Sequence, residues 1–265
     1  MVRIAGILNV TPDSFSDGGH FVRVDAAVAQ GRRLRAEGAD WVDVGGESTR
    51  PGSLGISADE ECARVLPVVS RLVEEGIPVS IDTSKPEVAR VCLQAGAVVV
   101  NDVNGLMAPG MMETVAEFGA GAVIMHKRGS PETMQLDTSY VDVVEEVCDY
   151  LSRQMQRARA FGIEQIWLDP GVGFGKSVQQ NCALIAQVRR IGALGAPVYI
   201  GASRKSFIGR ITGEERPMER LPGSLGAAVA AADAGAAVLR VHDVAETRAT
   251  LAVWGAIRDQ GLRER

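Results

Sequence analysis

The stretch P-V-S-I-D-T-S-K-P, from Pro78 to Pro86, contains the pattern that recurs along the whole chain. A short apolar run rich in β-branched residues ends in a carboxylate, a polar turn follows, and a helical pattern comes after the turn. The runs of this kind are Arg3–Leu8, Trp41–Val44, Pro78–Ile81, Ala97–Val100, Gly121–Met125, Gln165–Leu168, Pro197–Ile200 and Ala236–Val241.

Eight alternations of strand and helix predict an α/β fold in which the strands close into a (β/α)8 TIM barrel. Apolar residues recur at helical spacing over Asp25–Glu37, and Ser57–Glu60 resembles a capping box before a helix over Cys62–Glu74. Since periodicity alone does not prove that a sheet closes, an open doubly wound sheet is the alternative architecture.

The composition is that of a single globular domain. The chain has 265 residues, of which 46% are hydrophobic and 23% charged, with no linker or low-complexity block, so residues 1–265 are expected to form one domain. A net charge of -5 with scattered basic residues argues against nucleic-acid binding. No apolar run approaches the roughly 18 to 20 residues of a membrane span, and a strand-like run follows Met1 at once, so we expect a cytoplasmic protein.

The cysteines support the same compartment. Cys62, Cys92, Cys148 and Cys182 are far apart, fall in helical stretches and form no C-x-x-C pair. We therefore expect four buried thiols in a reducing cytosol rather than disulfides or a zinc site.

Polar residues stand at the C-terminal end of every predicted strand, which is the face where barrel enzymes place their active sites. One or two of them could be helix caps, but capping alone fits eight polar ends poorly. These residues are Asn9, Asp43, Asp82, Asn101, Asp102, His126, Asp169, Ser203, Arg204, Lys205, Arg240, His242 and Asp243.

Three of these carboxylates, Asp43, Asp82 and Asp169, lie in apolar runs and would be costly to bury without donor partners. A pterin supplies such donors, because its amino and ring N–H groups form a pair that an ionised carboxylate accepts. Asn101 can donate and accept, and Lys205 can meet the carbonyl oxygen and ring nitrogen at the other edge. A structural salt-bridge network of Asp82, Asp169 and Lys205 is one alternative, and a divalent metal held by clustered aspartates is another.

Two regions are candidates for an anion site. The segment G-V-G-F-G-K-S, Gly171–Ser177, is one residue too short between its glycines for a P-loop, so we interpret it as a tight loop with Phe174 and Lys176 exposed. Arg240 and His242 are two apart on one strand and project on the same side. With Asn9 on the neighbouring strand, they predict a place for a diphosphate and its Mg2+.

Two long loops complete the expected rim of the barrel. Thr11–Gly19 and Gly45–Gly55 are rich in glycine and hydrogen-bonding groups, which is typical of mobile lids and also of plain surface loops. Thr49 and Arg50 in the second loop favour a lid that closes over an anionic ligand.

Long motifs resemble those of one enzyme family, the dihydropteroate synthases of the pterin-binding barrels. Its two signatures are matched by G-I-L-N-V-T-P-D-S-F-S-D-G-G from Gly6 and by D-V-G-G-E-S-T-R-P-G from Asp43. Further motifs follow in family order over nearly the whole chain: I-D-T-S-K-P from Ile81, N-D-V from Asn101, M-H-x-x-G-x-P-x-x-M-Q from Met125, D-P-G-x-G-F-G-K from Asp169, S-R-K-S-F from Ser203 and R-V-H-D-V from Arg240.

The resemblance implies a transferase that joins a dihydropterin methyl diphosphate to p-aminobenzoate with loss of pyrophosphate, in folate biosynthesis. It also implies a (β/α)8 barrel, a Mg2+ ion, a homodimer and membership of the sulfonamide target class. Residues matching the family's pterin pocket are Asp43, Asp82, Asn101, Met125, Asp169 and Lys205. Those matching its diphosphate and Mg2+ site are Asn9, Thr49, Arg240 and His242, and those matching the p-aminobenzoate rim are Arg50, Pro51, Phe174 and Ser206.

From the residue types, the catalytic groups are expected to be Asp82, Asp169, Lys205, Arg240 and His242, acting by electrostatic stabilisation. Lys127 departs from the family, because many members have an apolar or amide residue there. A pterin-dependent methyltransferase and a noncatalytic pterin-binding protein are the alternative functions. A metal-dependent hydrolase would need more ligands at one centre than the three scattered histidines offer.

Overall fold

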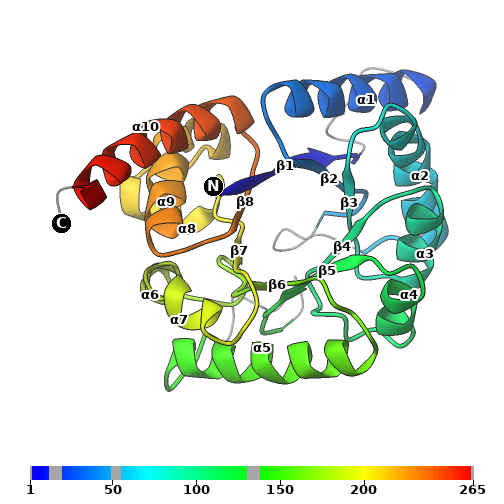
Figure 1. The fold of residues 1–265 in the computed structure, drawn as a ribbon. Helices are drawn as coiled ribbons and strands as arrows, with labels where there is room; N and C mark the ends of the chain where they lie inside the picture. Colours follow the sequence, from blue (N-terminus) through cyan, green and yellow to red (C-terminus); the bar gives the residue numbers. More distant parts are fainter. Residues whose placement is uncertain (1, 12–19, 49–54, 130–137, 264–265) are drawn as a thin grey trace.

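The computed structural model describes residues 2–11, 20–48, 55–129 and 138–263, and its strands confirm the predicted barrel. All neighbouring strands are parallel, in the order β6-β5-β4-β3-β2-β1-β8-β7 (Figure 1). The strands are β1 (Arg3–Asn9), β2 (Trp41–Gly45), β3 (Val79–Asp82), β4 (Val99–Asp102), β5 (Gly121–Met125), β6 (Ile166–Asp169), β7 (Tyr199–Ile200) and β8 (Val238–Val241).

The ring closes between β6 and β7, where the ladder is thinnest. A single bridge joins Leu168 to Val198, and the Leu168 N–H donates to the Pro197 carbonyl at 2.9 Å. Helices surround the strands on the outside only, whereas a doubly wound sheet would carry helices on both faces (Figure 1). The open-sheet alternative is therefore excluded.

Helices connect successive strands on the outside of the ring. They are α1 (His20–Ala36), α2 (Ala58–Glu74), α3 (Pro86–Gln94), α4 (Met111–Glu117), α5 (Val143–Ala160), α6 (Val178–Ala186), α7 (Val188–Gly192), α8 (Ser206–Thr212), α9 (Leu221–Asp233) and α10 (Val244–Arg263). In the described part of the chain, none of them combines the length and apolar character needed to cross a membrane.

Helix α2 begins as the sequence predicts, although only half of the capping box forms. The Ser57 hydroxyl accepts the Glu60 N–H at 3.1 Å, but the Glu60 carboxylate pairs with Arg64 instead of returning to the cap. A complete box forms at α6, where Ser177 and Gln180 bond reciprocally at 3.2 and 2.7 Å. This box fixes the point at which the loop after β6 becomes a helix.

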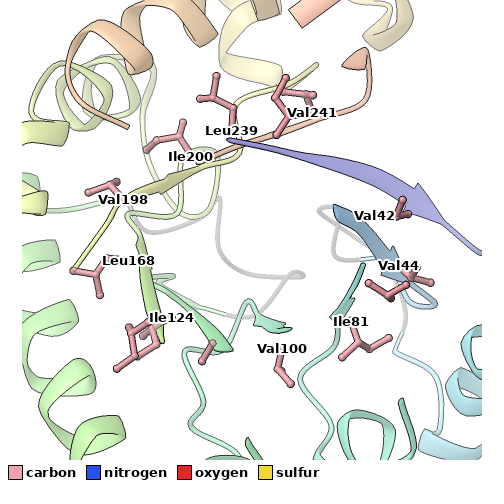
Figure 2. Close-up of a cluster of buried hydrophobic side chains, with 14 of the residues drawn as sticks. Val42, Val44, Ile81, Val100, Ile124, Leu168, Val198, Ile200, Leu239 and Val241 are labelled. Carbon is pink, nitrogen blue, oxygen red and sulfur yellow. The ribbon is translucent and has the colours of Figure 1, made fainter. Parts of the chain in front are cut away.

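Successive side chains along each strand point alternately outward, toward the helices, and inward, into the barrel. Outward residues such as Val44, Ile81 and Ile124 are fully buried between the strands and the helices (Figure 2). Inside the ring, the N-terminal end is filled by aromatic residues, with the Trp41 and Trp167 rings 5.7 Å apart and covered by the Arg3 guanidinium. The C-terminal end of the interior is left to the polar residues.

The cysteines are free thiols on four separate helices, as predicted, but not all are buried. Cys92 and Cys148 are buried, whereas Cys62 is half-buried and Cys182 is exposed. The prediction of four buried thiols is therefore wrong for Cys62 and Cys182, because helical spacing alone does not tell which face of a helix packs against the barrel.

Candidate active site

Strand register brings the predicted polar residues together inside the C-terminal end of the barrel. Asp82 pairs in register with Asn101, and Met125 with Asp169. Asp43 is fully buried, two residues before the end of β2. Their side chains share the inner face because parallel strands in register put residues of the same parity at the same level.

Arg240 on β8 is the centre of this cluster. Its Nε donates to Asp43 Oδ2 and its Nη2 to Asp82 Oδ2, each at 2.6 Å. Asn101 Nδ2 donates to the same Asp43 oxygen at 3.0 Å. The sequence grouped Arg240 with the diphosphate residues, whereas the structure places its guanidinium among the pocket carboxylates.

Burial strongly shifts the pKa values of the groups in this cluster. Burial raises the pKa of Asp82 to about 7, although the Arg240 guanidinium favours the ionised form, and the negative charge of Asp43 adds to the increase. Burial opposes the charge on Arg240, but Asp43 and Asp82 outweigh it and raise the pKa of Arg240 further. Asp43 Oδ1 is buried and has no hydrogen-bond partner among the described residues, which leaves one acceptor of this carboxylate unsatisfied.

Asp169 and Lys205 form the opposite wall. Asp169 Oδ1 accepts the Gly171 N–H at 2.7 Å, and the Lys205 ammonium donates to the Val172 carbonyl and lies 4.5 Å from the centre of the Phe174 ring. Burial lowers the pKa of Lys205 to about 8 and raises the pKa of Asp169. Among the ion pairs of the described ranges, none joins Lys205 to Asp169 or Asp82, so the salt-bridge network considered from the sequence is not formed.

The loop after β6 differs from its prediction at Lys176. Only 3% of this residue is exposed, since its ammonium is surrounded by hydrogen-bond acceptors of the loop and of His126. The prediction that Lys176 is an exposed loop residue is therefore wrong. Phe174 was also predicted to be exposed, but it is half-buried at the rim, beside Lys205.

The residues predicted for an anion lie at the C-terminal ends of β1 and β8, although Arg240 is in register with Ala5 rather than with Asn9. His242 Nδ1 lies 3.0 Å from the Ser203 hydroxyl, and Asn9 is in register with Gly45 on β2. Ser206 is exposed at the first position of α8. Thr49, Arg50, Pro51 and most of the loop Thr11–Gly19 lie outside the described residues.

The sequence did not predict the pairing of Arg240 with Asp43 and Asp82. The number of charges in the predicted pocket could have indicated this pairing. Three carboxylates in apolar runs were assigned to the pocket with only one cation, Lys205. A second cation was needed to bury them.

The four lysines of the chain show a further pattern. Each follows the end of a strand, whereas the 24 arginines are spread over the sequence. They are Lys85 after β3, Lys127 after β5, Lys176 after β6 and Lys205 after β7. All of the lysine ammonium groups therefore belong to loops at the C-terminal end of the barrel.

No preformed metal cage exists in the part of the chain that the structure describes, where no group of three or more His, Cys, Asp or Glu side chains could hold an ion. Asn9, at the end of β1, is still a residue of a kind that suits Mg2+. This ion prefers oxygen ligands, keeps several waters and is commonly held by one or two side chains together with substrate phosphates. The amide oxygen of Asn9 is such a donor, so the residues fit an ion that arrives with a diphosphate.

Comparison with known proteins gives one consistent result. The family described as Pterin binding enzyme matches residues 5–242. The dihydropteroate synthase of Escherichia coli strain K12 is 46% identical over 248 residues, which are 92% of this chain and 88% of that protein. That of Synechocystis sp. is 45% identical over 245 residues, 91% of this chain and 85% of that protein.

Solved structures agree with these relatives. The dihydropteroate synthase of Xanthomonas albilineans with 4-aminobenzoic acid superposes with a TM-score of 0.91 at 48% identity, covering 97% of this chain and 93% of that one. The same enzyme in complex with 7,8-dihydropteroate gives 0.88 at 45% identity, covering 97% and 94%.

The glycines of the loop after β6 yield a stability test. Gly171 has φ +70°, and a Cβ there would lie 1.8 Å from the His126 carbonyl oxygen. We expect Gly171→Ala to cost at least about 2 kcal/mol, from left-handed backbone strain and overpacking together. Gly213→Ala is the matched control, because Gly213 has φ +79° with nothing within 4 Å, and should cost about 1 kcal/mol. Thermal unfolding measures both, and equal losses would contradict the crowding argument.

Proposed function

We propose a function for this chain on the basis that it belongs to the pterin binding enzyme family: it is a dihydropteroate synthase of folate biosynthesis. It condenses (7,8-dihydropterin-6-yl)methyl diphosphate with p-aminobenzoate to give 7,8-dihydropteroate and pyrophosphate. The observation that carries this assignment is the cluster of buried carboxylates, cations and an amide at the C-terminal end of the barrel, in a chain whose relatives with this activity match over most of its length.

The pterin is held by the two walls of the cluster. Asp82 and Asp169 accept hydrogen bonds from the N–H groups of the pterin, while Lys205 donates to its carbonyl oxygen and ring nitrogen. Asn101 both donates and accepts, and Asp43, which accepts hydrogen bonds from Asn101 and Arg240, lies next to the ring. Met125, buried at the end of β5, supplies an apolar contact to the ring.

The reaction breaks the bond between the pterin CH2 and the diphosphate oxygen, and the bonding electrons leave with pyrophosphate. The amine nitrogen of p-aminobenzoate forms the new C–N bond and loses a proton to solvent. Positive charge on the pterin increases before the amine attacks, and the Asp82 and Asp169 carboxylates stabilise it. The amine is already a nucleophile, so no serine, cysteine or strong base is required.

The leaving pyrophosphate is stabilised from β8 and β1. Arg240 uses Nε and Nη2 on the carboxylates, so we assign its Nη1 to a phosphate oxygen, with His242 beside it. Asn9 would hold a Mg2+ ion, which supplies charge neutralisation of the diphosphate when bound. Thr49 is assigned to the same anion from its place in the motif.

The p-aminobenzoate rim is assigned to Phe174 and Ser206, together with Arg50 and Pro51 of the second loop. Support comes from the half-buried Phe174 ring beside Lys205 and from the exposed Ser206 at the start of α8. We further propose one pterin-binding domain over residues 1–265, a homodimer and a cytoplasmic location.

The alternatives make different products. A pterin-dependent methyltransferase would transfer a methyl group without releasing pyrophosphate, and a noncatalytic pterin-binding protein would bind the pterin and release nothing. Pyrophosphate release that requires p-aminobenzoate therefore separates the synthase from both alternatives.

We expect this release in the wild type and a loss of at least ~100-fold in turnover for Asp169→Asn and Lys205→Ala, because each leaves a buried polar edge of the pterin unpaired. Lys127→Met is the control and should keep its activity. Phosphate detection after pyrophosphatase treatment measures the rate. Pyrophosphate released equally with and without p-aminobenzoate would argue against a synthase.

The pKa values of Asp82 and Lys205 predict a narrow pH optimum. Asp82 must be ionised and loses its charge as the pH falls through about 7, while Lys205 must be protonated and loses its charge as the pH rises through about 8. We expect kcat/KM to be greatest between these pH values. Because the buried groups interact, the acidic and alkaline limbs of the pH profile reflect the titration of the whole set rather than of one residue. Lys205→Arg, which stays protonated, should move the alkaline limb upward. A flat profile from pH 6 to 9 would contradict this assignment.

Metal removal tests the role of Asn9. We expect pyrophosphate to bind at least ~10-fold more weakly by calorimetry after chelation of Mg2+ with EDTA, and Asn9→Ala to reduce the difference between the two conditions. Serial titrations of both proteins with pyrophosphate, with and without Mg2+, give the comparison. Equal affinities with and without Mg2+ in the wild type would remove the ion from the assigned site.

A further inference from the structure

The ammonium of Lys176 is held in a cage of acceptors beneath the loop after β6. Its Nζ lies 3.0 Å from the Gly171 carbonyl, 2.9 Å from that of Phe174, 3.4 Å from that of His126 and 3.1 Å from His126 Nδ1. Among the ion pairs of the described ranges, none includes Lys176. A buried ammonium without a carboxylate partner is costly, and burial lowers the pKa of Lys176 to about 7.

Lysine suits this cage better than arginine. Its three N–H donors radiate from one nitrogen and can reach carbonyls on several sides, whereas a guanidinium presents a flat fork. His126 must be neutral to accept through Nδ1, and burial, together with the charges of Lys176 and Arg128, lowers the pKa of His126 to about 3. The His126 ring is fixed edge-on against Tyr150, with ring centres 5.0 Å apart.

The cage shapes the turn from Pro170 to Gly175. Phe174 N–H donates to the Gly171 carbonyl at 3.1 Å, and the Lys176 ammonium binds the carbonyls at both ends of that turn. From α6, Asn181 accepts the Gly173 N–H at 2.6 Å and donates to the Lys176 carbonyl at 3.2 Å. The turn is thus fixed to β5 on one side by Lys176 and to α6 on the other by Asn181.

The same turn carries the groups that Lys205 contacts. Val172, between the two carbonyls bound by Lys176, accepts a hydrogen bond from the Lys205 ammonium, and the Phe174 ring lies against that ammonium. Gly173 also packs against the Lys205 chain, because a Cβ there would lie 2.7 Å from Lys205 Cδ. A displacement of the turn would therefore displace Lys205.

We propose that Lys176 is a positioning residue for the synthase reaction: its bonds to His126 and to the turn carbonyls fix the turn that places Lys205 for the pterin and Phe174 for p-aminobenzoate. Lys176 itself does not contact either substrate. The proposal rests on the function proposed above and adds a residue to it.

Lys176→Met tests the proposal, because it keeps the aliphatic chain and removes the donors. We expect 6-hydroxymethylpterin to bind at least ~10-fold more weakly by calorimetry, and KM for p-aminobenzoate to rise at least ~5-fold, since small misplacements of binding groups reduce affinity and rate. Lys127→Met is the matched control, one residue from His126 in the sequence, and should change either value less than twofold. Melting curves test whether both variants are folded.

A second pair of variants tests the other side of the bond. His126→Asn offers an amide oxygen near the position of Nδ1 and should stay within ~3-fold of the wild type, whereas His126→Leu should resemble Lys176→Met. This pair also decides the matter if Lys176→Met does not fold. Wild-type values in a folded Lys176→Met, or equal damage from the two His126 variants, would overturn the proposal. Failure of the wild type to bind the pterin would instead overturn the proposed function.

Discussion

Buried negative charge is what the C-terminal end of this barrel must accommodate. Asp43 and Asp169 are buried and only 12% of the Asp82 side chain is exposed, so these carboxylates cannot remain ionised without cations or N–H donors close by. Arg240 meets Asp43 and Asp82 across the interior. The loop after β6 meets Asp169 through the Gly171 N–H. Each partner comes from a different strand, so this compensation depends on the strand ends lying close together. A ligand with its own donors can join the arrangement without creating unpaired charge.

The scaffold separates stability from chemistry along each strand. Outward positions such as Ile81 and Ile124 are apolar and fully buried under the helices, while the inward positions near the strand ends are polar apart from Met125. The aromatic floor of Trp41 and Trp167 fills the other end of the interior. Because the two sets alternate in sequence, a change in the pocket does not remove apolar area from the outer shell. Polar groups that destabilise the interior can therefore be tolerated at this end of the barrel.

Much of this was predictable from the sequence, and the exceptions have a common cause. Eight strands, their parallel order and the polar residues at their ends followed from period and spacing, which depend on the backbone. The direction of a long side chain does not. Arg240 reaches the carboxylates, and Lys176 turns inward beneath its own loop, because acceptors from remote parts of the chain converge there. Sequence spacing does not show where such acceptors converge. It also does not show that Cys182 lies on the exposed face of α6.

The placement of the four lysines has a practical consequence for chemical labelling. Reagents that acylate or reductively alkylate primary amines usually modify many surface lysines, so their products are heterogeneous. In this chain, where surface cations are arginines, the only side-chain amines are Lys85, Lys127, Lys176 and Lys205 at the C-terminal end of the barrel. Lys205 also has a lowered pKa, which gives it more of the nucleophilic free amine near neutral pH. Apart from the α-amino group, amine-directed fluorophores, cross-linkers or resins would thus modify the mouth of the barrel, and an electrophile carried by a pocket ligand would find a lysine within reach.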